Sequence, residues 1–197
     1  MYKPYDVEIK YLESTGTQYI DTGIKDYTTS IRFVLDVQYT DTTGRQLNGT
    51  ANAMYFGVNA GRWECAYQNY YGTADTLRHV YSKTGTHSGN NFIQTIELDG
   101  TQIGTVTATW NVNQVGGTLR IFSIGSASLP SKEKIYSAKV YVDDNLVRDM
   151  IPVRVSNIGY LFDKVSCQLF GNAGTGSFTL GPDMYDSRIE YLQATGT

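Results

Sequence analysis

Hydrophobic and polar residues alternate along much of this chain with the two-residue period of a β-strand. The clearest run spans residues 31–39, in which mostly polar residues alternate with Ile31, Phe33, Leu35, Val37 and Tyr39. Successive side chains of a strand point to opposite faces, so this run predicts a strand with one buried face. Other β-rich runs predict strands at 8–12, 18–24, 54–58, 62–71, 77–82, 92–98, 101–110, 119–124, 135–142, 146–155, 160–163, 167–170 and 178–180.

Gly, Asn, Asp, Ser and Thr gather between the predicted strands. They predict loops at 41–52 and 83–91 and a turn at Ser14–Thr17. Asp99-Gly100 separates two β-rich runs, and this dipeptide is a strong signal for a tight hairpin. The sequence contains no convincing amphipathic helical pattern of ten or more residues. Many short strands separated by turns predict an all-β sandwich or barrel.

The end of the chain repeats its beginning. Residues 189–197 match residues 9–17 at six of nine positions, with an offset of 180. A period of this length fits a row of whole domains, because a typical domain has roughly 100–150 residues or somewhat more. We therefore expect a leader at 1–6, one domain at 7–182, and a linker with the truncated start of a second repeat at 183–197.

Composition supports the β assignment and excludes some partners. The chain has 16 Tyr, a residue type that packs well on pleated surfaces, and only 4 Pro. The net charge is −3, so no nucleic-acid partner is expected. No apolar stretch approaches the roughly 20 residues of a membrane span, and no signal peptide or membrane insertion is expected.

Three stretches carry a family resemblance. They are residues 11–23 (YLESTGTQYIDTG), residues 134–154 (KIYSAKVYVDDNLVRDMIPVR), and Gly159–Asp163 together with residues 170–179 (FGNAGTGSFT). They resemble concanavalin A-like lectin/glucanase (LamG-like) modules, which occur in phage tail and virion proteins and in surface proteins of gut bacteria. The resemblance implies an antiparallel two-sheet jelly-roll sandwich over nearly all of 7–182. It also implies that the first and last strands lie near each other.

The hydrolases of this fold carry a Glu-x-Asp-x-x-Glu pattern, which places two carboxylates on one strand face. The nearest match, residues 96–102 (IELDGTQ), has Gln at the third position and a turn glycine inside it. We therefore expect no enzyme and no catalytic residues, with a glycoside hydrolase that uses Glu97 as the least favoured alternative.

No metal site and no cofactor are expected. His79 and His87 alone cannot form a three-ligand zinc site. Calcium stays open as an alternative, with ligands from Asp41, Asp143 and Asp144. We expect Cys65 and Cys167 to be buried as small apolar side chains, with a disulfide between them as the alternative.

Aromatic residues give the one positive signal for a ligand site. Flat rings can stack on the faces of sugars when they lie together on a surface. The candidate ligand-binding residues are Trp63, Tyr67, Tyr70, Tyr71 and Tyr81. The competing interpretation places about half of these rings in the core.

These observations favour a non-catalytic module of a larger multi-domain protein, either a phage structural protein or a bacterial surface protein. Its expected partner is a glycan or another cell-surface ligand, and its expected location is the virion or the cell surface. The alternative is a purely structural spacer or decoration domain that associates with itself in a phage fibre or virion.

Overall fold

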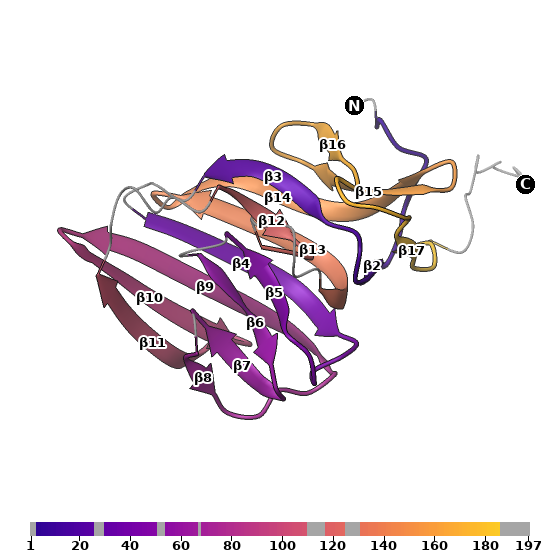
Figure 1. Cartoon of the computed structure of the whole chain (residues 1–197). Helices are drawn as coiled ribbons and strands as arrows, with labels where there is room; N and C mark the ends of the chain where they lie inside the picture. Colours follow the sequence, from indigo (N-terminus) through magenta and orange to yellow (C-terminus); the bar gives the residue numbers. More distant parts are fainter. Residues whose placement is uncertain are drawn as a thin grey trace, which may run out of the picture.

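The computed structural model describes residues 3–25, 30–50, 54–66, 68–109, 117–124 and 131–185. Within these ranges the protein consists of strands and turns, with no helix, and so no helix that could cross a membrane. Two antiparallel sheets pack face to face as a sandwich (Figure 1). The predicted all-β, two-sheet jelly-roll architecture is therefore confirmed.

The larger sheet has eleven strands in the part of the chain that the structure describes. Its main path runs in the spatial order β11-β10-β9-β4-β13-β14-β15-β16. Off this path, β1 pairs with β14, β2 pairs with β13, and β17 pairs with β2. The strands are β1 (Val7–Glu8), β2 (Leu12–Thr15), β4 (Ser30–Tyr39), β9 (Arg78–Ser88), β10 (Asn91–Leu98), β11 (Thr101–Thr109), β13 (Lys132–Val142), β14 (Asn145–Val155), β15 (Ile158–Asp163), β16 (Gln168–Phe170) and β17 (Thr179–Leu180).

The smaller sheet has six strands among the described residues, in the spatial order β3-β12-β5-β6-β7-β8. They are β3 (Ile20–Lys25), β5 (Gln46–Gly49), β6 (Tyr55–Asn59), β7 (Arg62–Cys65), β8 (Tyr70–Tyr71) and β12 (Thr118–Ile121).

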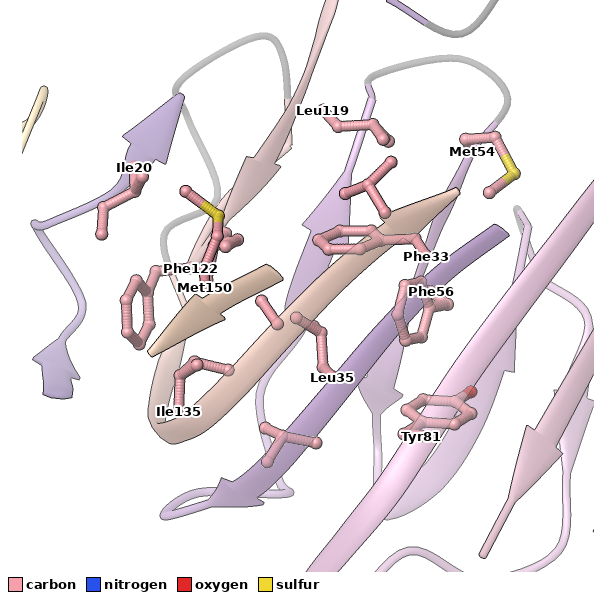
Figure 2. Packing of buried hydrophobic residues seen from close by; sticks show 14 of the residues in the cluster. Ile20, Phe33, Leu35, Met54, Phe56, Tyr81, Leu119, Phe122, Ile135 and Met150 are labelled. Carbon is pink, nitrogen blue, oxygen red and sulfur yellow. The ribbon is translucent and has the colours of Figure 1, made fainter. Parts of the chain in front are cut away.

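Strand β4 lies at the centre of the core, as its alternating pattern predicts. All five apolar residues of the run are at most 1% exposed, whereas the residues between them are exposed or half-buried. Figure 2 shows Phe33 and Leu35 facing the smaller sheet. Phe33 packs edge-on against Phe56 of β6 with ring centroids 5.6 Å apart, and Phe56 packs against Tyr81 of β9 at 4.7 Å. These aromatic contacts join the two sheets.

Two hairpins form with two-residue turns, and the first confirms the hairpin predicted at Asp99-Gly100. β10 and β11 are joined by Asp99 and Gly100, whose φ angles are 51° and 79°. β13 and β14 are joined by Asp143 and Asp144, at 48° and 63°. Positive φ at both turn positions matches the right-handed twist of the flanking strands, and Asp and Gly tolerate it better than most residues.

Several predicted loop boundaries were wrong. β5 lies inside the expected loop 41–52, and β9 continues to Ser88 through most of the expected loop 83–91. The predicted turn at Ser14–Thr17 begins later, since β2 extends to Thr15. The predicted strand 62–71 is broken at Ala66, whose φ of 61° separates β7 from β8.

The beginning and the end of the described chain lie close together in the larger sheet, as the resemblance implies. β2 lies between β13 and β17 and pairs with both, and β1 pairs with β14. After β17, the backbone N–H of Met184 donates to the carbonyl oxygen of Glu8 at 2.9 Å. The chain therefore leaves the domain next to the point where it begins.

Candidate functional site

The structure divides the predicted aromatic cluster. Trp63 is 4% exposed and Tyr81 is fully buried, so both rings belong to the core and cannot stack on a ligand at the surface. Trp63 packs against Tyr81 and Tyr39, with ring centroids 5.0 and 6.1 Å apart. The Tyr81 hydroxyl donates to the carbonyl oxygen of Glu64 at 3.1 Å, which satisfies its polar atom inside the sandwich. Tyr67 lies outside the described residues.

Tyr70 and Tyr71 are half-buried on the edge strand β8. The Tyr71 hydroxyl donates to the carbonyl oxygen of Thr105 at 2.8 Å, and its ring covers Gly104, where a Cβ would lie 2.5 Å from ring atoms. Tyr71 thus connects β8 to the opposite sheet. The Tyr70 ring lies 4.5 Å from the guanidinium carbon of Arg62. Among the candidate ligand-binding residues that the structure describes, only Tyr70 and Tyr71 are partly exposed.

A buried ion pair lies beneath this edge. The Glu64 side chain is fully buried, and its Oε1 accepts hydrogen bonds from Nη2 of Arg45 at 3.1 Å and from the backbone N–H of Gln68 at 3.2 Å. Oε2 accepts a third hydrogen bond from Nε of Arg45 at 3.3 Å. Glu64 follows Trp63 in β7, so their side chains point to opposite faces of the strand, yet both are buried. This carboxylate therefore holds the turn that follows β7 and is not open to a substrate.

A groove of about 430 Å³ opens elsewhere, where the two ends of the chain meet the larger sheet. β1, β9, β13 and β14 contribute to it together with the segment after β17. Its lining residues are Glu8, Ile9, Lys10, Arg78, Tyr136, Ile151, Pro152 and Met184. These residues are spread over the whole sequence, and no local motif marks them.

Tyr136 and Arg78 form one wall of the groove. The Arg78 guanidinium carbon lies 3.8 Å from the centroid of the Tyr136 ring, and its nitrogens donate to both carboxylate oxygens of Asp36 at 2.7 Å. The Tyr136 hydroxyl donates to Oε1 of Gln38 at 3.0 Å, and Tyr11 packs edge-on against its ring at 5.6 Å. The ring is therefore held in a fixed orientation.

The opposite rim carries charges of both signs. Oε1 of Glu8 accepts hydrogen bonds from the Tyr5 hydroxyl at 2.7 Å and from Nζ of Lys3 at 3.1 Å. Partial burial opposes ionisation of Glu8, but these hydrogen bonds outweigh it and lower the pKa of the carboxyl. Lys10 adds a positive charge to the lining. The groove thus combines apolar and aromatic walls with ionic hydrogen-bonding groups.

The candidate calcium ligands do not come together. Within the described ranges, no group of three or more His, Cys, Asp or Glu residues could hold a metal ion. Oδ1 of Asp41 accepts two hydrogen bonds from Thr43, and Oδ1 of Asp143 accepts one from the backbone N–H of Ser30. Asp41 therefore stabilises its own turn, as an Asx turn does, whereas Asp143 holds the start of β4.

The two cysteines are free and differ in burial. Cys65 is fully buried in the core, as predicted, whereas Cys167 is exposed in the turn between β15 and β16. Cys167 has a φ of 57°, and the expectation that it would be buried was wrong. The alternative of a disulfide between them is excluded, because both thiols are free.

The side chains of Glu97 and Asp99 each bind neighbouring groups of the larger sheet. Oε2 of Glu97 accepts a hydrogen bond from the Ser82 hydroxyl at 3.2 Å and lies 3.7 Å from Arg32. Asp99 sits in the hairpin turn, where its Oδ1 accepts from the backbone N–H of Val80 at 2.8 Å. Its other oxygen contacts His79.

His79 bridges two carboxylates. Its Nδ1 lies 2.6 Å from Oδ2 of Asp99, and its Nε2 lies 3.0 Å from Oδ1 of Asp75. Partial burial disfavours the imidazolium, but the hydrogen bonds to Asp99 and Asp75 outweigh it and raise the pKa of His79. The bridge joins the start of β9 to the β10–β11 turn.

This geometry predicts a pH-dependent contribution to stability. Because folding raises the pKa of His79, the contribution is fully present below the unfolded value of about 6.5 and is lost as the pH rises through the folded value. We expect Asp75→Asn to lower the pKa of His79, as measured by NMR titration of the ring protons, with Asp41→Asn as the control. An unchanged titration in Asp75→Asn would contradict the bridge.

The glycine-containing loop of the family resemblance, within residues 170–179, has a structural role. Oδ1 of Asn172 accepts hydrogen bonds from the backbone N–H groups of Tyr19 and Gly174, at 3.2 and 2.8 Å. A Cβ at Gly174 would lie 2.3 Å from the carbonyl oxygen of Thr17, and Gly176 has a φ of 70°. The loop thus fixes the start of the chain against its end, and glycine is required for that close approach.

Comparison with known proteins adds no relative from which a function could be transferred. No protein-family model matches the sequence, and a search of curated proteins gives no significant match.

Proposed function

We propose that this chain is a non-catalytic binding module of a larger multi-domain protein, which takes a carbohydrate or another cell-surface ligand in the groove beside Tyr136. The proposal includes membership of the concanavalin A-like group, on the sequence resemblance and the sandwich fold. It also includes a setting in a phage structural protein or a bacterial surface protein.

The groove is the observation that carries the proposal. Its volume of about 430 Å³ lies in the usual range of small-ligand sites, about 300–1,000 Å³. One aromatic ring with a fixed orientation lines it, and charged groups at the rim can hydrogen-bond to hydroxyls. Sugars offer this combination of a flat apolar face and peripheral hydroxyls.

The charges of the lining favour binding over hydrolysis. Among the described residues that line the groove, Glu8 is the one carboxylate, and Tyr5 and Lys3 already occupy its Oε1. A glycosidase of the usual kind needs two carboxylic groups on either side of the scissile bond. A tandem array of such modules would add avidity to weak individual binding.

The second candidate is a spacer or decoration domain of a phage fibre or virion. The adjacency of Glu8 and Met184, together with the repeat at 189–197, favours it, because such a domain needs its two connections close together. In this alternative the groove is covered by protein contacts between copies.

The Tyr136 ring provides the test. We expect the chain to bind glycans on an array, and Tyr136→Ala to weaken the best hit at least about tenfold, because ring stacking is lost. Tyr141→Ala removes another half-buried ring from the same strand and should leave binding unchanged. The absence of any hit, even for a protein with tandem copies, would count against glycan binding and favour the spacer.

A further inference from the structure

The repeat extends beyond the nine residues that first reveal it. With the same offset of 180, Tyr185-Asp186 corresponds to Tyr5-Asp6. The residues between these pairs and the nine-residue match differ, since Ser187-Arg188 stands where the first copy has Val7-Glu8. The second copy therefore begins no later than Tyr185.

In the first copy, Tyr5 and Asp6 fasten the start of the chain to the β14–β15 hairpin. The Tyr5 ring packs on Phe162 of β15, with centroids 5.0 Å apart, and its hydroxyl donates to Glu8. Oδ2 of Asp6 accepts from the backbone N–H of Ser156 in the hairpin turn at 2.6 Å. The backbone N–H of Asp6 donates to the carbonyl oxygen of Arg154 at 3.0 Å. We refer to Tyr5-Asp6 as the clasp.

The residues just before Tyr185 belong to the first copy. The carboxylate of Asp183 accepts two hydrogen bonds from the Arg154 guanidinium, at 3.1 and 3.0 Å. The backbone N–H of Met184 donates to Glu8. These contacts hold the chain against the domain up to Met184, at the side where both ends meet (Figure 1).

Tyr185 itself is 70% exposed, the highest value among the large apolar side chains of the described residues. Its counterpart Tyr5 is half-buried on Phe162. The same residue type at the same repeat position thus has a ring partner in one copy and open solvent in the other. A following copy would offer the missing surface, namely its own counterpart of Phe162.

We propose that Tyr185 begins the clasp of a following copy of this domain. The two copies then meet with no linker, at the peptide bond between Met184 and Tyr185. Consecutive Cα atoms are about 3.8 Å apart, so two copies fastened on either side of one bond have little freedom to reorient. The array is a stiff rod of domains and not a flexible chain of beads. This inference is independent of any ligand in the groove.

A two-copy chain tests the clasp. It is made by continuing residue 197 directly into residues 18–184, with the second copy isotope-labelled by segmental ligation for NMR. We expect Tyr185→Ala to lower the thermal midpoint of the second copy by about 2–4 °C, through loss of the ring contact. In the 197-residue chain the same change should leave the midpoint unaltered, whereas Tyr5→Ala should lower it by a similar amount.

Leu77→Ala is the matched control, because Leu77 is also strongly exposed, at 64%, and precedes β9. It should leave both midpoints unchanged. If Tyr185→Ala likewise has no effect on the second copy, Tyr185 is not its clasp and the proposal is overturned.

Rotational diffusion tests the missing linker. The unmodified two-copy chain should tumble as one body, and insertion of Gly-Ser-Gly-Ser between Met184 and Tyr185 should shorten its correlation time towards that of a single domain. The same insertion into the Gly89-Asn90 turn of the first copy should not. Independent tumbling of the unmodified chain would overturn the stiff junction.

Discussion

Replacing Glu133 by glutamine is expected to raise the free energy of unfolding by about 4 kcal/mol at pH 8 and by less than about 1 kcal/mol at pH 5. Glu133 is the second residue of β13 and is fully buried between the sheets. Asn48 donates to its Oε2 at 3.0 Å, and Oε1 has no hydrogen-bond partner among the described residues. Burial raises the pKa of this carboxyl from 4.5 to about 8.

The sign of the pH effect follows from the two protonation states. Between about pH 4.5 and 8 the folded carboxyl keeps its proton while the unfolded one has lost it. The unfolded state then binds fewer protons, so stability falls as the pH rises through this window. Over the full window the wild type loses about 5 kcal/mol of its free energy of unfolding. Glutamine cannot ionise, so the Glu133→Gln variant does not lose this stability.

Denaturant titrations of the wild type and Glu133→Gln at pH 5 and pH 8 measure the effect. Glu97→Gln serves as the control, because Glu97 is a partly exposed carboxylate of the same sheet. The control should keep the wild-type pH dependence. If Glu133→Gln keeps it as well, another group is responsible for the titration.

Strands with one buried face could be predicted from the sequence because their signal is local. β4 is recognisable from its period alone, and the β10–β11 turn from Asp99-Gly100. The period tells which side chains share a face, but not whether the second face is also covered. Trp63 and Glu64 lie on opposite faces of β7, and both are buried.

Strand β9 shows why a polar sequence can still be core. Residues 83–88 (KTGTHS) have the composition of a turn, and a loop was predicted there. In the structure Nζ of Lys83 donates to the carbonyl oxygen of Tyr55 at 2.6 Å from a fully buried position. Gly85 is needed because a Cβ would lie 2.3 Å from the ring of Phe92. Only the packing of the neighbouring strands explains why lysine and glycine occupy positions 83 and 85.

The groove and the buried carboxyl depend on strand register, which the sequence does not specify locally. Glu133 lies directly opposite Tyr39 because β13 pairs with β4 in that register. Tyr136 reaches Arg78 across β4, from a strand more than fifty residues away in the sequence. Short motifs carry no information about such pairs.

The second large effect is expected at Asp163, the last residue of the Gly159–Asp163 motif in the family resemblance. Its carboxylate is fully buried and organises the turn after β15. Oδ1 accepts from the backbone N–H groups of Asp149 and Val165, at 2.8 and 3.2 Å. Oδ2 accepts from the backbone N–H and the hydroxyl of Ser166, at 3.1 and 2.6 Å.

Asp163→Ala should lower the free energy of unfolding by about 3–5 kcal/mol, because it leaves these buried donors without an acceptor. It also removes the carboxylate that lies 3.7 Å from the Arg148 guanidinium. Asp163→Asn keeps one acceptor oxygen and should cost less. Denaturant unfolding followed by circular dichroism measures both.

Asp36→Ala is the informative comparison, since Asp36 also binds an arginine, Arg78, through two hydrogen bonds, but at the surface. Surface ion pairs contribute about 0–1 kcal/mol, so its loss should be small. If Asp36→Ala and Asp163→Ala lowered the free energy of unfolding equally, burial of Asp163 and its hydrogen bonds from the turn backbone would not contribute to stability. The larger loss predicted for Asp163→Ala would instead show that the Gly159–Asp163 motif stabilises the β14–β15 region. The clasp of Tyr5 and Asp6 packs on this region.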